Sequence, residues 1–268
     1  MSEAERDHWG RYKLPDPVTG ETRPWTRATT LAEAMQDTYG LTGWKMRMVA
    51  VGIGLREDLQ DLAAASDPED KKQLDQLCKD AMSIAQADVR SNKGTSLHKY
   101  TQRLDQGQKI RAPRRWAADI AAYELAKKTW GIRTAPTMCE RVTLIPELEV
   151  AGTMDRIVKY QDIPMIFDLK TGNDVERGAM KIAIQLALYS RGIGLWNEET
   201  EQFDPMPRGL DQEIGLVLHL PAGEATASLY EVNLKLGWRA AQLAYEVRKF
   251  RKDKEYMKKV GESVSVSD

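Results

Sequence analysis

Two aspartates and a lysine could form a metal-dependent hydrolytic site. Residues 149–160 and 163–170 are predicted to be antiparallel strands joined by a two-residue turn. In that register Asp155 stands directly across from Asp168, with their Cβ atoms roughly 5 Å apart on one face. Lys170 comes two residues after Asp168, so its side chain points to the same face.

The register depends on a turn at Gln161-Asp162, and the other face of the hairpin provides a check. Paired residues on that face are apolar, as a buried face requires, with one arginine as the exception. The pairs are Tyr160 with Ile163, Met154 with Leu169, Val158 with Met165, and Arg156 with Phe167.

Carboxylates this close repel each other unless a cation or a shared proton compensates. The repulsion is about 3 kcal/mol at an effective dielectric constant near 20. Mg²⁺ or Mn²⁺ would relieve it and could also bind a phosphate oxygen, while Lys170 orients or deprotonates the attacking water. The alternative is a solvated hairpin with scattered charges, because an isolated Asp-x-Lys is common on exposed strands.

Four short motifs occur in order along the chain. They are Gly94-Thr-Ser-Leu-His98, Gly152-Thr-Met-Asp155, Asp168-Leu-Lys170-Thr-Gly172 and Gln185-Leu-Ala-Leu-Tyr189. In these motifs the sequence resembles the RecB-type branch of the PD-(D/E)XK nucleases, and residues 27–55 resemble the helical lead-in of phage-encoded members. The resemblance implies an α/β fold of the restriction-endonuclease-like class, a mixed β-sheet core flanked by helices after a helical N-terminal region.

The resemblance also implies a role for each motif residue. The implied metal ligands are His98, Asp155, Asp168 and the backbone carbonyl of Leu169. The implied catalytic residues are Lys170, Asp155 and Asp168. Taken alone, His98 could be structural, as we expect for His8 and His219.

Gln185 and Tyr189 match a motif that lies near DNA in this family. Their four-residue spacing puts both on one helix face, although they could equally line a core helix. Glu140 matches an extra acidic residue of some members. The iron–sulfur branch uses four cysteines and this chain has two, Cys78 and Cys139, so we expect no iron–sulfur cluster.

Basic residues cluster around the first motif. Residues 89–115 contain eight basic side chains and one acidic side chain, Asp105, a pattern typical of a surface that follows phosphates. A second basic cluster at 248–259 is interpreted as a solvated helix face. The basic residues of the first cluster are Arg90, Lys93, Lys99, Arg103, Lys109, Arg111, Arg114 and Arg115, of which Lys99, Arg103, Arg114 and Arg115 are predicted to bind DNA. Trp116 and Tyr100 could stack on bases or belong to the core.

Composition sets limits without choosing a function. The chain has 268 residues and a formal net charge of -1, so DNA affinity must come from local clusters. No segment has the run of 18 or more apolar residues that spans a bilayer, and the N-terminus is polar. We therefore expect a soluble protein of the cytoplasm, or of the host cytoplasm if the chain is phage-encoded.

Changes in periodicity divide the chain into four regions. Residues 1–26 are predicted to be an irregular arm, because they contain three prolines and two glycines. Residues 27–135 form a helical region that carries the His98 motif, with a first helix capped by Thr30 and a second at 41–62. Residues 136–260 form the nuclease core, with strands, a helix at 175–196, two further strands and a helix from Leu236 to Lys259. Residues 261–268 form a flexible tail.

These features together predict a Mg²⁺- or Mn²⁺-dependent nuclease that acts on DNA. An exonuclease of recombination, repair or end processing is the favoured form. A structure-selective or restriction-type endonuclease, or a DNA-binding module that keeps the nuclease fold without turnover, is the alternative. The expected partner is DNA, with a homo-oligomer or a recombination protein as a further possibility.

Overall fold

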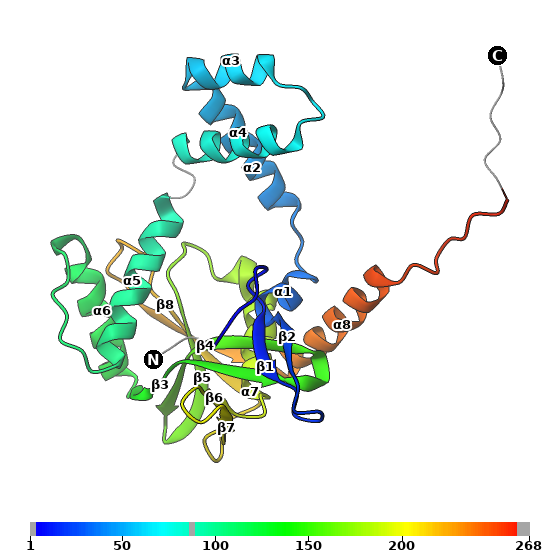
Figure 1. Cartoon of the computed structure of the whole chain (residues 1–268). Coiled ribbons are helices and arrows are strands. Elements are labelled where there is room, and N and C mark those ends of the chain that lie inside the picture. The colour runs from blue at the N-terminus through cyan, green and yellow to red at the C-terminus, as the bar shows by residue number, and fades with distance from the viewer. Residues whose placement is uncertain (1–3, 86–88, 262–268) are drawn as a thin grey trace, which may run out of the picture.

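The computed structural model describes residues 4–85 and 89–261, which fold around one mixed sheet (Figure 1). Within these residues the strands are β1 (Tyr12–Pro15), β2 (Thr22–Arg27), β3 (Arg133–Ile145), β4 (Val150–Tyr160), β5 (Ile163–Lys170), β6 (Leu195–Asn197), β7 (Gln202–Asp204), β8 (Ile214–His219) and β9 (Ser228–Asn233). Their order is β7-β6-β3-β4-β5-β8-β9, with β2 beside β4 and β1 beside β2. β3, β4 and β5 form an antiparallel meander, whereas β5 and β8 run parallel.

Helices cover both faces of the sheet. They are α1 (Ala28–Glu33), α2 (Tyr39–Gly54), α3 (Glu57–Ala65), α4 (Lys71–Ile84), α5 (Val89–Asp105), α6 (Ala117–Thr129), α7 (Ala179–Ser190) and α8 (Leu234–Lys252). α1, α7 and α8 pack on one face around Ile184 and Ala241, and α5 and α6 pack on the other around Leu97 and Tyr123. α2, α3 and α4 pack mainly on one another and stand away from the sheet (Figure 1). None of the described helices is both long and apolar enough to cross a bilayer.

The predicted register of the β4–β5 hairpin is confirmed. Every pair in this ladder follows it, beginning with Tyr160 opposite Ile163. The turn residues Gln161 and Asp162 have φ angles of 50° and 66°, as a two-residue type I′ turn requires. The ladder ends one residue before the two predicted carboxylates, so it contains neither the predicted pair Asp155–Asp168 nor the pair Met154–Leu169. Met154 and Leu169 pack in different core clusters, because the two strands part there.

Residues 1–26 do not form the irregular arm that we predicted. Their described part contains the β1–β2 hairpin, whose Tyr12 and Trp25 are buried against β3 and β4. β2 also pairs in parallel with the start of β4. The prediction was wrong because prolines were interpreted as breakers. Pro15 ends β1, and Pro24 precedes the part of β2 that pairs with β4, so neither interrupts the β2–β4 ladder.

The region 27–135 is helical up to the start of β3, but its helices have different limits from those predicted. The first begins at Ala28, so Thr30 lies inside it and is not its N-cap. The predicted helix at 41–62 is interrupted at Arg56, whose backbone is extended. Apolar spacing continued through this break, so it gave no sign of two helices.

The core region 136–260 contains the predicted strands and helices in the predicted order. The helix at 175–196 is shorter than predicted, and α7 covers only 179–190. β6 and β7 were not predicted, because three residues are too few to show alternation. α8 ends at Lys252, short of the predicted end. Residues 262–268 of the predicted tail lie outside the described residues.

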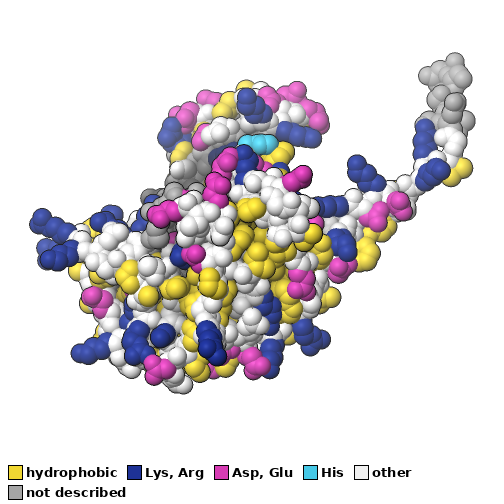
Figure 2. Space-filling model, turned by 60° about the horizontal axis from the view of Figure 1, so that its bottom comes forward, with side chains coloured by type: hydrophobic (Ala, Val, Ile, Leu, Met, Phe, Trp, Pro, Cys, Tyr) yellow, Lys and Arg dark blue, Asp and Glu magenta, His cyan; other side chains and the backbone are white. Residues whose placement is uncertain are grey.

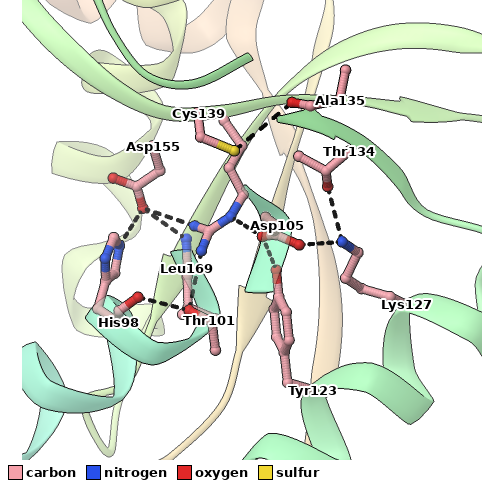
Figure 3. Close-up of polar contacts among 11 residues, drawn as sticks. His98, Thr101, Asp105, Tyr123, Lys127, Thr134, Ala135, Cys139, Asp155 and Leu169 are labelled. Atoms are coloured by element: carbon pink, nitrogen blue, oxygen red, sulfur yellow. Dashed lines mark hydrogen bonds and ion pairs between the residues drawn. The ribbon is translucent and has the colours of Figure 1, made fainter. Parts of the chain in front are cut away.

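A buried ion pair attaches α5 to the sheet. The Arg156 side chain on β4 is fully buried and pairs with Asp105 at the end of α5. Asp105 also accepts hydrogen bonds from Tyr123 and Lys127 of α6 (Figure 3). A second bond to α5 joins Arg156 Nη2 to Thr101 Oγ1 at 3.0 Å. The helix that carries His98 is therefore fixed to the strand that carries Asp155.

Asp105→Ala should lower the free energy of unfolding by about 3–5 kcal/mol, because it leaves Arg156 buried without its partner. Urea denaturation of the purified chain measures this. Arg103→Ala is the matched control, since Arg103 is exposed on the same helix, and it should cost less than about 1 kcal/mol. Similar losses in the two variants would contradict the role of the ion pair.

Candidate metal centre

The candidate centre lies where β4 and β5 part. Past the last paired residues of this hairpin, the backbone N–H of Leu169 donates to Asp155 Oδ2 at 3.1 Å. The Asp155 carboxylate thus accepts the hydrogen bond that a backbone carbonyl of β4 would accept in a continued ladder. β5 here pairs with β8 on its other side, where Asp168 and Lys170 are in register with Val217 and His219. The site residues therefore sit at the carboxyl end of β5.

His98 lies on α5, which places it beside Asp155 of β4. His98 Nε2 lies 2.7 Å from Asp155 Oδ2 (Figure 3). The neighbouring Leu97 is fully buried in the core beneath α5, which fixes the face that this helix turns to the sheet. The structure therefore brings together two of the predicted metal ligands, His98 and Asp155, although the chain separates them by 57 positions.

Glu140 completes a set of three possible metal ligands. One ligand atom from each of His98, Glu140 and Asp155 can be chosen so that all three lie within 4.8 Å of one another. Glu140 has a φ of 51° and follows the shift in the β3–β4 register, which lies between Thr134 and Cys139. Two carboxylates and an imidazole could hold a divalent cation.

Asp168 and Lys170 form the second half of the centre. Lys170 Nζ lies 2.7 Å from Asp168 Oδ2. This oxygen is buried and makes no hydrogen bond of good geometry to any described residue, so the contact is an ion pair. Asp168 is not part of the three-ligand cluster. A buried oxygen with this remaining capacity fits a cation that Asp155 and Asp168 share, which stays a prediction.

The charges of the site shift the pKa values in opposite directions. Burial and the charge of Asp155 raise the pKa of Asp168 to about 6, against the opposing effect of Lys170. Burial would also raise the pKa of Asp155, but the hydrogen bond and charge of His98 hold it well below its usual range. Burial would lower the pKa values of His98 and Lys170, but the aspartates outweigh it and raise both. One acid is therefore ionised while the other tends to keep its proton.

The predicted role of the Leu169 carbonyl as a metal ligand remains a prediction. What the structure gives for this residue is its N–H bond to Asp155. Glu140 was noted in the sequence from the family resemblance alone, because the β3–β4 register, which shifts between Thr134 and Cys139, could not be predicted from alternation. His219, expected to be structural, has its Nε2 2.6 Å from the carbonyl oxygen of Gly172.

Gln185 and Tyr189 lie on α7, which packs on the sheet beside the centre. Both side chains are buried, with 8% and 6% exposed, so the core interpretation describes their position and their contact with DNA stays a prediction. Tyr189 lies close to β4. A Cβ atom at Gly152 would come within 2.7 Å of Tyr189 Cε1 and 2.9 Å of Ala28 Cβ. This glycine is therefore required for packing.

The residues predicted to bind DNA through charge are exposed. Lys99 and Arg103 lie on α5, and Arg114 and Arg115 lie in the connection to α6. Figure 2 shows dark blue side chains gathered at this end of the molecule. Asp105, the acidic member of the cluster, is buried and does not offset their charge at the surface. The side chains of Arg90 and Lys93 lie outside the described residues. Trp116 is buried and Tyr100 packs against the same core.

Comparisons with known proteins identify no family. No family model and no curated protein matches the chain. Among solved structures, one described as the crystal structure of SSO0001 aligns with 49% of this chain at 14% identity and a TM-score of 0.28. The alignment spans 57% of that chain. A likeness at this level carries no argument, so function must be inferred from the site.

If the three-ligand cluster holds a cation, Mn²⁺ should raise the thermal midpoint of the wild type by about 5 °C or more at ~100 times the dissociation constant. The rise should largely disappear in His98→Ala, Glu140→Ala and Asp155→Ala. Asp174→Ala, which removes an exposed carboxylate after β5, should keep it. Differential scanning calorimetry with Mn²⁺ and with EDTA gives the measurement, and an equal rise in all variants would exclude this cluster.

Metal-free protein should lose stability as the pH rises through about 6. The pKa of Asp168 is higher in the folded protein than in the unfolded chain. The resulting stabilisation is complete at a pH below the unfolded pKa and is lost as the pH rises through the folded pKa. Between about pH 5 and about pH 7.5 the wild type should lose roughly 1 kcal/mol more than Asp168→Asn. Urea denaturation in EDTA tests this. Equal pH dependence of the unfolding free energy in both proteins would show that the pKa of Asp168 is not raised in the folded protein.

Proposed function

We propose that the chain is a divalent-metal-dependent deoxyribonuclease with a restriction-endonuclease-like core of the RecB-type branch. The observation that carries the proposal is the charge cluster past the end of the β4–β5 ladder, in which Lys170 pairs with Asp168 and His98 pairs with Asp155. Three of the four motifs supply these residues. Phosphodiester hydrolysis needs such a combination of oxygen ligands and a nearby amine.

Each residue has a distinct task in this mechanism. His98, Glu140 and Asp155 would hold Mg²⁺ or Mn²⁺, with Asp168 as a further ligand. Such a cation would supply a water molecule of lowered pKa and neutralise phosphate charge. The Lys170 ammonium, whose pKa is raised by the aspartates, would orient the attacking water and donate to a phosphate oxygen. A cation held by Asp168 would weaken its pairing with Lys170 and leave the ammonium available to the substrate.

DNA is the favoured substrate because the exposed basic residues flank the centre. Lys99 follows His98 directly, and Arg103 lies on the same helix. Arg114 and Arg115 extend the basic surface toward α6. Contacts of this kind bind phosphates without reading sequence. They support a nuclease of broad sequence tolerance, in keeping with end processing and less so with a restriction enzyme.

Lys170→Ala and Asp168→Ala should each reduce the degradation of end-labelled linear DNA with Mg²⁺ or Mn²⁺ by on the order of a hundredfold or more. Lys159→Ala is the control, because Lys159 is an exposed lysine on the same hairpin and should be dispensable. Circular dichroism of each variant separates lost chemistry from lost folding. Folded variants with wild-type activity would refute the site.

A second assay separates the proposed exonuclease from its alternatives. Covalently closed circular DNA offers no end, so an exonuclease should leave it intact while it degrades the linearised form. Cleavage of the circle would favour an endonuclease. Binding of linear DNA without cleavage under any divalent cation would favour a non-catalytic module, against which the complete set of His98, Asp155, Asp168 and Lys170 argues.

A further inference from the structure

An apolar stripe runs along the solvent side of α8. Its members follow one another at intervals of four and three residues, the spacing of a coiled-coil seam. They are Leu236, Ala240, Leu243, Val247 and Phe250. The exposed fractions of Leu236, Leu243 and Phe250 are 61%, 59% and 61%. Apolar side chains scattered singly need no explanation, but a continuous stripe at this spacing indicates a helix that packs on another helix.

The stripe leads into an apolar groove between α7, β9 and the start of α8. The groove has a volume of about 460 Å³, and Leu236 and Ala240 form part of its wall. Its other apolar residues include Val175, Met180, Ile182, Val217, Tyr230 and Val232. Its acidic members are Glu176 and Glu231, both exposed. Figure 2 shows hydrophobic side chains gathered over the part of the surface from which the C-terminal extension leaves.

We propose that a second copy of the chain covers this surface, with the two α8 helices antiparallel and a two-fold axis near Leu243. Phe250 and Leu236 are about 21 Å apart along one helix. In the antiparallel pair, Phe250 of each copy therefore lies against Leu236 of the other copy and enters its groove. The same surface of the chain thus carries both the projecting Phe250 ring and the groove that receives this ring from the other copy. A two-fold interface requires such self-complementarity. The proposal is independent of the nuclease function.

Charges at both ends of the interface support this occupant. Phe250 lies between Lys249 and Arg251 on α8, and the groove that would receive it carries Glu176 and Glu231. Basic residues of each copy therefore meet acidic residues of the other. Complementary charges of this kind fix the register of a helix pair.

A second charge match lies close to the two-fold axis. Arg239 and Glu246 flank the stripe, are both exposed and lie at nearly equal distances on either side of Leu243. In an antiparallel pair, Arg239 of each copy faces Glu246 of the other. A parallel pair would instead set Arg239 opposite the uncharged Ala244, so the charges favour the antiparallel arrangement.

Sedimentation equilibrium of the full chain tests the dimer. The wild type should be a dimer that dissociates in the micromolar range, and Phe250→Glu should be monomeric at every concentration used. Leu125→Glu is the control, because Leu125 is 64% exposed on α6, and it should dimerise as the wild type does. A wild type that stays monomeric at tens of micromolar would overturn the proposal, and so would a Phe250→Glu variant that still dimerises.

Charge exchange and cross-linking test the geometry. Arg239→Glu and Glu246→Arg should each weaken dimerisation at least tenfold, and the double variant should recover it. In a Cys78→Ser background, Leu243→Cys should form an intermolecular disulfide under mild oxidation, and Leu125→Cys should not. Failure of the double variant to recover, or equal cross-linking at the two positions, would contradict an antiparallel pair centred on Leu243.

Discussion

The charges of Asp155 and Asp168 act on each other just past the last pair of the β4–β5 ladder, and the rest of the centre offsets the negative charge that gathers there. The Leu169 N–H and His98 both bond to Asp155 Oδ2. Lys170 pairs with Asp168. The bond between Leu169 and Asp155 depends on the β4–β5 register, because a shift of one residue would turn each side chain to the opposite face of the sheet.

The same register places Arg156, the next residue after Asp155, on the opposite face of β4. There it is buried and pairs with Asp105, which fixes α5 and with it His98. Its Nη1 atom has no hydrogen-bond partner among the described residues and lies 4.0 Å from Asp155 Oδ2. Asp155 is thus a candidate ligand. The next residue, Arg156, anchors the helix that carries another candidate ligand, His98.

Alternation of side chains and turn length predict strand pairing where the two-residue period is unbroken and the turn is short. The two-residue turn at Gln161-Asp162 predicts the pairs from Tyr160–Ile163 to Arg156–Phe167, and the β4–β5 ladder contains them. The same rules failed where the chain departs from a period. Glu140 follows a shift in the β3–β4 register, and the partners of Arg156 lie on helices that no strand pattern could place. The β1–β2 hairpin was missed because its stability comes from long-range burial of Trp25 against β3 and β4.

The distribution of protons follows from the same crowding. Three carboxylates, those of Glu140, Asp155 and Asp168, share the centre with His98 and Lys170. The raised pKa values of Asp168 and His98 mean that, without a cation, protons supply part of the missing positive charge. Metal ligands must be deprotonated to bind, so a dication and these protons compete for the same groups. Affinity for the metal should therefore grow as the pH rises through the range in which Asp168 and His98 titrate, and the free energy that the metal-free fold loses there is regained when the cation binds.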